Sequence, residues 1–274
     1  ENIDDLRGLL PSGKGLRIVA TTTNNAGWEH HNWKTIKVGV FDRSESIDYL
    51  LTVTRCDDHD AADALAQRLG DLPLALAQAA ATARHKDLSL ARYLKRLESR
   101  RQEPTIHTVA GGDYTVDVAT ALLMAIKDTI EGLEGNTRET AQRQLGALAL
   151  LAESGVPTRW LDPTIERLDD DESDDSKGNT DEDAHDALTE LGCRCIVQQA
   201  IDGSTTVLHR LQAQVLRESW SERELKQAYE SASALLGSVD LEDFPRNATD
   251  LLRRETRDLI EQLYALSTQD HSCL

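Results

Sequence analysis

The sequence predicts a mainly α-helical protein with a short α/β segment at its start and a β-hairpin in its second half. Aromatic residues make up only 4% of the 274 residues, and Ala, Leu, Asp, Glu and Arg are abundant, a composition that favours helices. The β-branched, apolar run Leu16–Thr23 has the pattern of a buried parallel strand. Two strand-like runs flank Asp202-Gly203, which is a strong hairpin signal.

The first segment combines one helix with two short strands. Apolar residues on one face predict a helix over Glu1–Leu10, a strand follows at Leu16–Thr23, and Trp33–Val40 is predicted to be a second strand. Ligands of open α/β sheets bind beyond the carboxyl ends of the strands. Thr22 and Thr23 therefore occupy the place of a phosphate sensor, although polar residues also end strands that bind nothing.

A group of four helices is predicted next, at Ser46–Leu51, Asp60–Leu69, Pro73–Lys86 and Ser89–Leu97. The corner between the second and the third reads Gly70-Asp71-Leu72-Pro73. Pro is favoured at the first helical position because its missing N–H would be unpaired there anyway. Gly suits a helix end that needs a positive φ. These residues by themselves indicate a turn and a packing helix that begins at Pro73.

The second half is predicted to contain helices around a hairpin. The strands are Cys195–Gln199 and Thr205–Leu211, and the helices are Val116–Glu131, Asn136–Leu151, Thr180–Leu191 and Leu211–Glu218. Helix, hairpin, helix is the outline of a winged helix. The acidic run 169–183 is predicted to be a mobile loop, because like charges repel and extend the chain. Two final helices, Ser221–Leu236 and Ala248–Leu266, are similar to the pairs that begin a repeat array.

The composition argues against several classes of function. A net charge of −18 disfavours binding to nucleic acid or to an anionic membrane, since phosphate contacts need Lys and Arg. The four Cys are few and irregularly spaced, so no disulfide framework is predicted, which suits a reducing compartment. The sequence has no long apolar run and no signal peptide, so we expect a cytoplasmic protein.

Motifs for catalysis or metal binding are not found in the sequence. The run 8–14 spells most of a phosphate-binding P-loop, but Gly15 stands where Ser or Thr must hold Mg²⁺. A helix precedes this run and a strand follows it, which is the reverse of the order that a P-loop needs. Cys193 and Cys195 lack the C-x₂-C spacing of a zinc site. We therefore expect no metal site and no enzymatic activity in this chain itself.

Three segments together resemble motifs of the NB-ARC proteins, a branch of the STAND class of signalling ATPases. The corner Gly70-Asp71-Leu72-Pro73-Leu74 resembles their Gly-Leu-Pro-Leu motif, and Leu16–Thr23 resembles their sensor strand. Leu208-His209-Arg210 resembles their Met-His-Asp motif, which bacterial members often write as Val-His-Arg. Two positions depart from the family. Thr23 replaces an Arg and cannot neutralise a γ-phosphate, and the Asp of the last motif is absent.

The resemblance implies a fragment of a longer parent, whose P-loop and magnesium-binding strand would precede Glu1. The implied domains are the end of an α/β NTPase core at 1–43, a helical module at 44–103, a winged-helix domain at 104–220, and a linker or the start of helical repeats at 221–274.

The implied function is a nucleotide-gated switch, in which ADP holds the closed state and ATP releases it. The implied nucleotide contacts are Thr22 and Thr23 at the phosphates, Pro73 and Leu74 at the base, and His209 at the β-phosphate. ADP or ATP would bind firmly only in the intact parent, a slow ATPase whose missing core would supply Mg²⁺. We expect partner proteins and self-association through helical surfaces. Two alternatives are a helical adaptor with degenerate nucleotide contacts and a DNA-binding regulator, which would need a basic helix.

Overall fold

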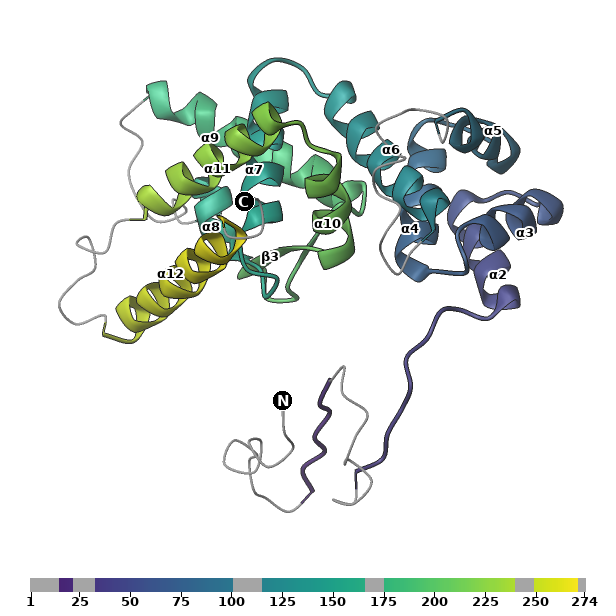
Figure 1. The fold of residues 1–274 in the computed structure, drawn as a ribbon, viewed down its shortest axis with the longest axis horizontal. Coiled ribbons are helices and arrows are strands. Elements are labelled where there is room, and N and C mark those ends of the chain that lie inside the picture. The colour runs from purple at the N-terminus through teal and green to yellow at the C-terminus, as the bar shows by residue number, and fades with distance from the viewer. Residues whose placement is uncertain (1–14, 22–32, 101–114, 166–174, 240–248, 271–274) are drawn as a thin grey trace. The chain divides into compact units, whose positions relative to one another are not determined.

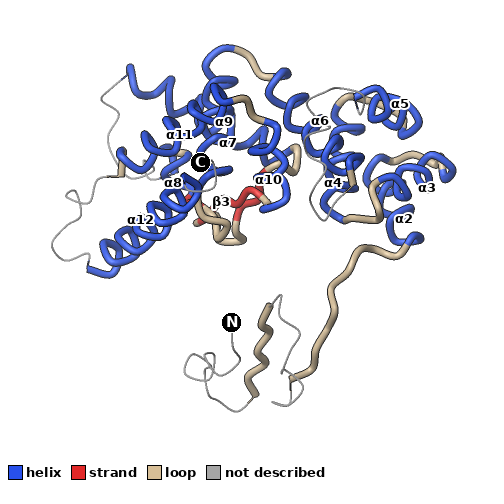
Figure 2. Tube along the Cα trace, viewed as in Figure 1, coloured by secondary structure: helices blue, strands red, loops and turns tan. Residues whose placement is uncertain are grey.

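The computed structural model describes residues 15–21, 33–100, 115–165, 175–239 and 249–270. Most of these residues are helical, and a small three-stranded sheet accompanies them (Figure 2). This confirms the prediction of a mainly α protein. The chain divides into two units, residues 1–40 and residues 41–274, which are described separately.

The first unit does not contain the two predicted strands in its described parts. Residues 16–21 and 33–40 have neither helical nor strand structure, and Val19 and Val38 are almost fully exposed. The backbone N–H and C=O groups of a strand must form hydrogen bonds with a neighbouring strand. The described residues offer these two segments no such neighbour, so the strand predictions are wrong there. The predicted helix at Glu1–Leu10 lies outside the described residues.

Four helices open the second unit: α2 (Arg43–Thr54), α3 (His59–Arg68), α4 (Pro73–His85) and α5 (Leu90–Arg100) (Figure 1). All four predicted helices are confirmed. Asp42 and Glu45 form a capping box at the start of α2, and Asp58 accepts a hydrogen bond from the N–H of Ala61 at 3.0 Å. The core of the group consists of fully buried Leu, Tyr and Ala side chains, including Leu50, Leu65, Leu69, Leu76 and Tyr93.

The turn before α4 is tied to the start of α2. Gly70 has φ +60°, as predicted, and Asp71 has φ +56°. The Arg43 guanidinium donates two hydrogen bonds to the Asp71 carboxylate, at 2.9 and 2.8 Å. The Phe41 N–H donates to the Asp71 carbonyl oxygen at 3.0 Å. These bonds fix the corner where α4 begins.

The sheet is assembled from strands far apart in the sequence. Its elements are β1 (Val156–Pro157), β2 (Val197–Gln199) and β3 (Thr205–Leu208), in the antiparallel order β1-β3-β2. Val197 pairs with Leu208 in the predicted hairpin, which is confirmed, and Val156 pairs with Thr206. Strand β1 was not predicted, because two residues are too short to show an alternating pattern.

The helical elements of the same region are α6 (Val116–Gly132), α7 (Gly135–Leu150), α8 (Thr158–Leu161), the 3₁₀ turn η3 (Pro163–Ile165), α9 (Asp175–Cys193) and α10 (Arg210–Ser219). Of these, α7, α8 and α9 contact the strands. The predicted acidic loop at 169–183 is wrong from Asp175 onward, because α9 begins there. Buried Ala187, Leu188 and Leu191 anchor α9.

Two helices complete the unit: α11 (Glu222–Gly237) and α12 (Thr249–Asp270). Both were predicted. Helix α11 packs directly on α7, where Gly146 lets the two backbones approach, while α12 contacts α7, α11 and β1. The region predicted as a linker or the start of repeats therefore packs against α7, and its last helix also contacts β1.

Candidate functional site

The predicted site residues lie in three separate parts of the chain. Thr22 and Thr23 lie outside the described residues. Pro73 and Leu74 form the first turn of α4 and are half-buried, and Leu74 packs against the core. The prediction that α4 begins at Pro73 is confirmed.

His209 joins the hairpin to the helix that follows it. Strand β3 ends at Leu208, and His209 is the N-cap of α10. Its Nδ1 accepts a hydrogen bond from the Leu211 N–H at 3.2 Å. In the neutral ring the proton is therefore on Nε2, since each imidazole nitrogen is either a donor or an acceptor. The exposed side chain can donate one hydrogen bond to an oxygen atom of a ligand.

The surroundings of His209 favour its neutral form. Loss of hydration against the surrounding protein is the largest cause that lowers the pKa of His209, and the positive charge of Arg210 adds to it. The Glu153 carboxylate opposes both and raises the pKa. His209 is thus a hydrogen-bond donor that brings no charge of its own near pH 7.

Helix α4 and the segment before the hairpin are joined by hydrogen bonds. The side chain of Gln78, which is fully buried, donates from Nε2 to the Cys195 carbonyl oxygen at 2.6 Å. At the end of the same helix, His85 Nε2 contacts the Arg194 guanidinium. Cys195 has φ +57°, in the turn that links α9 to β2. No local pattern predicts these contacts, because Gln78 lies more than a hundred positions from Cys195.

The turn at Cys195 connects the helix that begins at Pro73 with the hairpin that ends before His209, whereas Pro73, Leu74 and His209 themselves do not make this connection. Within the described ranges, no hydrogen bond or ion pair links Pro73 or Leu74 to His209. A hydrogen bond does join the two regions, from Gln78, one turn beyond Leu74, to Cys195, which precedes the hairpin.

Two cavities lie elsewhere in the second unit. The larger, of about 920 Å³, is bounded by α6, α7, α10 and α11, with an apolar floor that includes Leu123, Ile126 and Leu216. The smaller, of about 310 Å³, lies between α7, α8, α9 and α11. Neither is lined by Pro73, Leu74 or His209.

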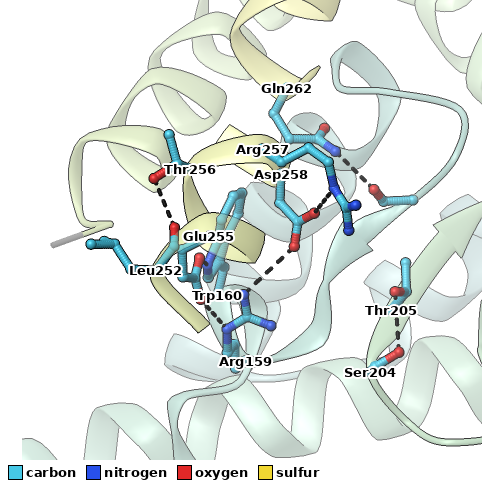
Figure 3. A network of polar contacts seen from close by, with 11 residues as sticks. Arg159, Trp160, Ser204, Thr205, Leu252, Glu255, Thr256, Arg257, Asp258 and Gln262 are labelled. Carbon is cyan, nitrogen blue, oxygen red and sulfur yellow. Dashed lines mark hydrogen bonds and ion pairs between the residues drawn. The ribbon is translucent and has the colours of Figure 1, made fainter. Parts of the chain in front are cut away.

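A buried polar network holds α12 (Figure 3). The Glu255 carboxylate accepts hydrogen bonds from the Arg159 guanidinium and from Trp160 Nε1, the latter at 3.1 Å. Gln262 accepts from the Ala152 N–H at 2.8 Å and donates to the Gly155 carbonyl at 2.8 Å. Glu255 and Gln262 are 5% and 1% exposed, so both anchors are satisfied by partners and not by water. This network positions a helix.

Within the described residues, no group of three or more His, Cys, Asp or Glu side chains could hold a metal ion, and Cys56, Cys193 and Cys195 are free thiols. Among the described helices, none combines the length and the apolar character needed to span a bilayer.

No protein-family model matches the chain, and no curated protein matches it.

Proposed function

We propose that this chain is the regulatory part of a nucleotide-gated signalling switch of the NB-ARC type. In this proposal α2–α5 form the helical module, and residues 104–220, which include α6 to α10, form the winged-helix domain. The order helix, strand, helices, hairpin and helix, with sheet order β1-β3-β2, supports the second assignment. ADP would be held by both parts, and its exchange for ATP would separate them.

The observation that carries the proposal is the hydrogen bond from Gln78 to Cys195. Helix α4 begins at the proline corner, and Cys195 precedes the hairpin that ends at His209. A bond between these two elements supports a closed state in which both motifs belong to one body. A ligand shifts such an equilibrium only by the difference between its affinities for the two states.

The residues on each side suit different parts of a nucleotide. The Nε2–H of His209 suits a phosphate oxygen, and the apolar surface of Pro73 and Leu74 suits a base. In this proposal the metal and the phosphate-binding loop come from another part of the parent protein, and among the described residues no group of three or more side chains could hold a metal ion. We therefore propose that this chain alone has no ATPase activity and binds nucleotide weakly.

Calorimetry with ADP tests the proposal on the parent protein that contains this chain. Removing a hydrogen bond to a charged phosphate costs roughly 1.5–3 kcal/mol, so His209→Ala should weaken ADP binding by about 10- to 100-fold. His59→Ala, at an exposed histidine on α3, is the matched control and should leave affinity unchanged. Equal ADP affinity in the two variants would refute the switch, and micromolar binding by this chain alone would refute the assignment of the missing half.

A helical adaptor is the second candidate function. It is favoured by the exposed apolar side chains of α12, namely Ile260, Leu263 and Tyr264. In that case nucleotide binding would not respond to His209, and partner binding would depend on α12.

A DNA-binding function finds no support in the charges. In helix-turn-helix arrangements the second helix contacts the DNA. Helix α10, after the hairpin, has Arg217 and Glu218 but no cluster of positive charge. Helix α9, before the hairpin, includes Glu182, Asp186 and Glu190. Such a helix repels phosphates.

A further inference from the structure

Helix α12 exposes an apolar face. In the described part of residues 41–274, the large apolar side chains that stand exposed are Ile201, Ile260, Leu263 and Tyr264. The last three are 62%, 49% and 71% exposed and are spaced i, i+3 and i+4, which puts them on neighbouring positions of one helix. Single exposed apolar residues are common, but a cluster of them marks an interaction surface.

The opposite side of α12 is anchored by polar groups. Glu255 and Gln262 stand seven positions apart, two helical turns, and both are buried against the residues around β1 (Figure 3). Asp258 adds an ion pair with Arg159 at 3.8 Å. The side of α12 that faces the protein therefore carries these polar anchors beside Leu259 and Leu266, whereas Ile260, Leu263 and Tyr264 remain open to solvent.

The spacing of the apolar residues is that of a helix that packs along another helix. Leu252, Thr256, Leu259, Leu263 and Leu266 follow one another at intervals of 4, 3, 4 and 3 residues, the a and d spacing of a coiled coil. Leu259 and Leu266 touch the core, whereas Leu263 is half-exposed. A second helix can thus lie over Leu263 beside the core.

Two arginines give this face a positive charge. The side chains of Arg253 and Arg257 are 82% and 76% exposed. Arg253, Arg257, Ile260 and Tyr264 follow one another at intervals of four, three and four residues, so they form a stripe along one side of the helix. The ion pairs of the two arginines with Asp250 and Asp258 are long, at 3.9 Å, and leave most of their hydrogen-bonding capacity available.

We propose that the α12 face, made of Arg253, Arg257, Ile260, Leu263 and Tyr264, binds an amphipathic helix of a partner protein. The apolar stripe of the partner packs over Leu263, Ile260 and Tyr264, and acidic residues at one end of that stripe pair with the two arginines. Charge decides against a second copy of this chain, because two chains of net charge −18 repel each other. The proposal does not depend on nucleotide binding.

Fluorescence anisotropy with two labelled synthetic helical peptides tests the proposal on the full chain. Both peptides carry the same leucine stripe, and one is flanked by Glu where the other has Lys. We expect the Glu-flanked peptide to bind at least tenfold more tightly, since like charges in an interface disfavour the wrong partner. Replacing Ile260 and Tyr264 together by Ser should weaken its binding at least tenfold, because two large apolar contacts are lost.

A charge reversal separates the charge pairing from the apolar packing. Arg253→Glu with Arg257→Glu should reverse the preference, so that the Lys-flanked peptide binds more tightly. Arg223→Glu, at an exposed arginine on α11, is the matched control and should leave the preference unchanged.

Three results would overturn the proposal. They are absence of binding by both peptides, equal affinity for the two, and sedimentation of the chain as a dimer that the Ile260 and Tyr264 substitutions dissociate. The last result would assign the face to a second copy.

Discussion

Gly146→Ala tests the close approach of α7 and α11. A Cβ added at Gly146 would stand 3.1 Å from the Ala228 Cα and 3.3 Å from its Cβ. Ala is favoured over Gly inside a helix by about 1 kcal/mol. Overpacking a close contact costs typically about 1–3 kcal/mol, and a backbone Cα gives way only if the whole of α11 shifts. We therefore expect a net destabilisation of about 1 kcal/mol.

Gly192→Ala is the matched control for this prediction. Gly192 lies near the end of α9, and a Cβ added there meets nothing within 4 Å. The helix preference then acts alone, and the variant should be stabilised by about 0.5–1 kcal/mol. Guanidinium denaturation followed by circular dichroism measures both unfolding free energies. If Gly146→Ala stabilised the protein as much as Gly192→Ala, the packing of α11 on α7 would be wrong.

Three further substitutions test the corner and the turn that join the helices. Gln78→Ala leaves the Cys195 carbonyl without its partner and opens a small cavity, so unfolding should become easier by about 2–4 kcal/mol, whereas Gln142→Ala on the exposed side of α7 should change little. Asp71→Asn loses the fork from Arg43, and denaturation should show a loss of about 1–2 kcal/mol at neutral pH. The Arg43 hydrogen bonds hold the pKa of Asp71 below its ordinary value. The stabilisation by this carboxylate is therefore present above about pH 4 and is lost as the pH falls further. In acid, the difference in unfolding free energy between Asp71→Asn and wild type should become smaller. Loss of hydration, then the positive charges of Arg194 and Lys86, lower the pKa of His85 against the opposing effect of Glu190. The contribution of neutral His85 to the unfolding free energy is therefore present above pH 6.5 and declines below it. His85→Gln should make the unfolding free energy less dependent on pH between about pH 7 and 5. The control His59→Gln, at an exposed site, should leave the pH dependence unchanged.

The helices and the hairpin could be predicted because their signals are local. Pro73 begins α4 through its own missing N–H, and Asp202-Gly203 turns the hairpin through its own backbone preferences. The acidic run at 169–183 was misjudged for a related reason. Charge repulsion acts locally, but the buried residues that extend α9 to Asp175 lie further along the chain.

The predicted strands failed because a strand is not a local structure. Leu16–Thr23 has the right composition, yet its stability depends on neighbours that must come from elsewhere. The same limit explains β1, whose two residues gain strand structure only from pairing with β3.

The contacts at the candidate site also differ in whether they could be predicted, because some join near residues and others join distant ones. His209 could be singled out because Leu208-His209-Arg210, three consecutive residues, resembles a family motif, and its hydrogen bond reaches only two residues along the chain. Gln78, Arg194 and the buried anchors of α12 could not be singled out, because nothing in their neighbouring residues distinguishes them from solvated polar side chains.

The amino acids alone determined where this chain forms helices, where it turns and that its net charge is strongly negative, since these properties depend on residues close together or on simple sums. Tertiary structure decided which polar side chains are buried and which apolar ones are left open. Gln262 is buried and Tyr264 is exposed on the same helix, and only the position of α12 against distant residues makes the difference.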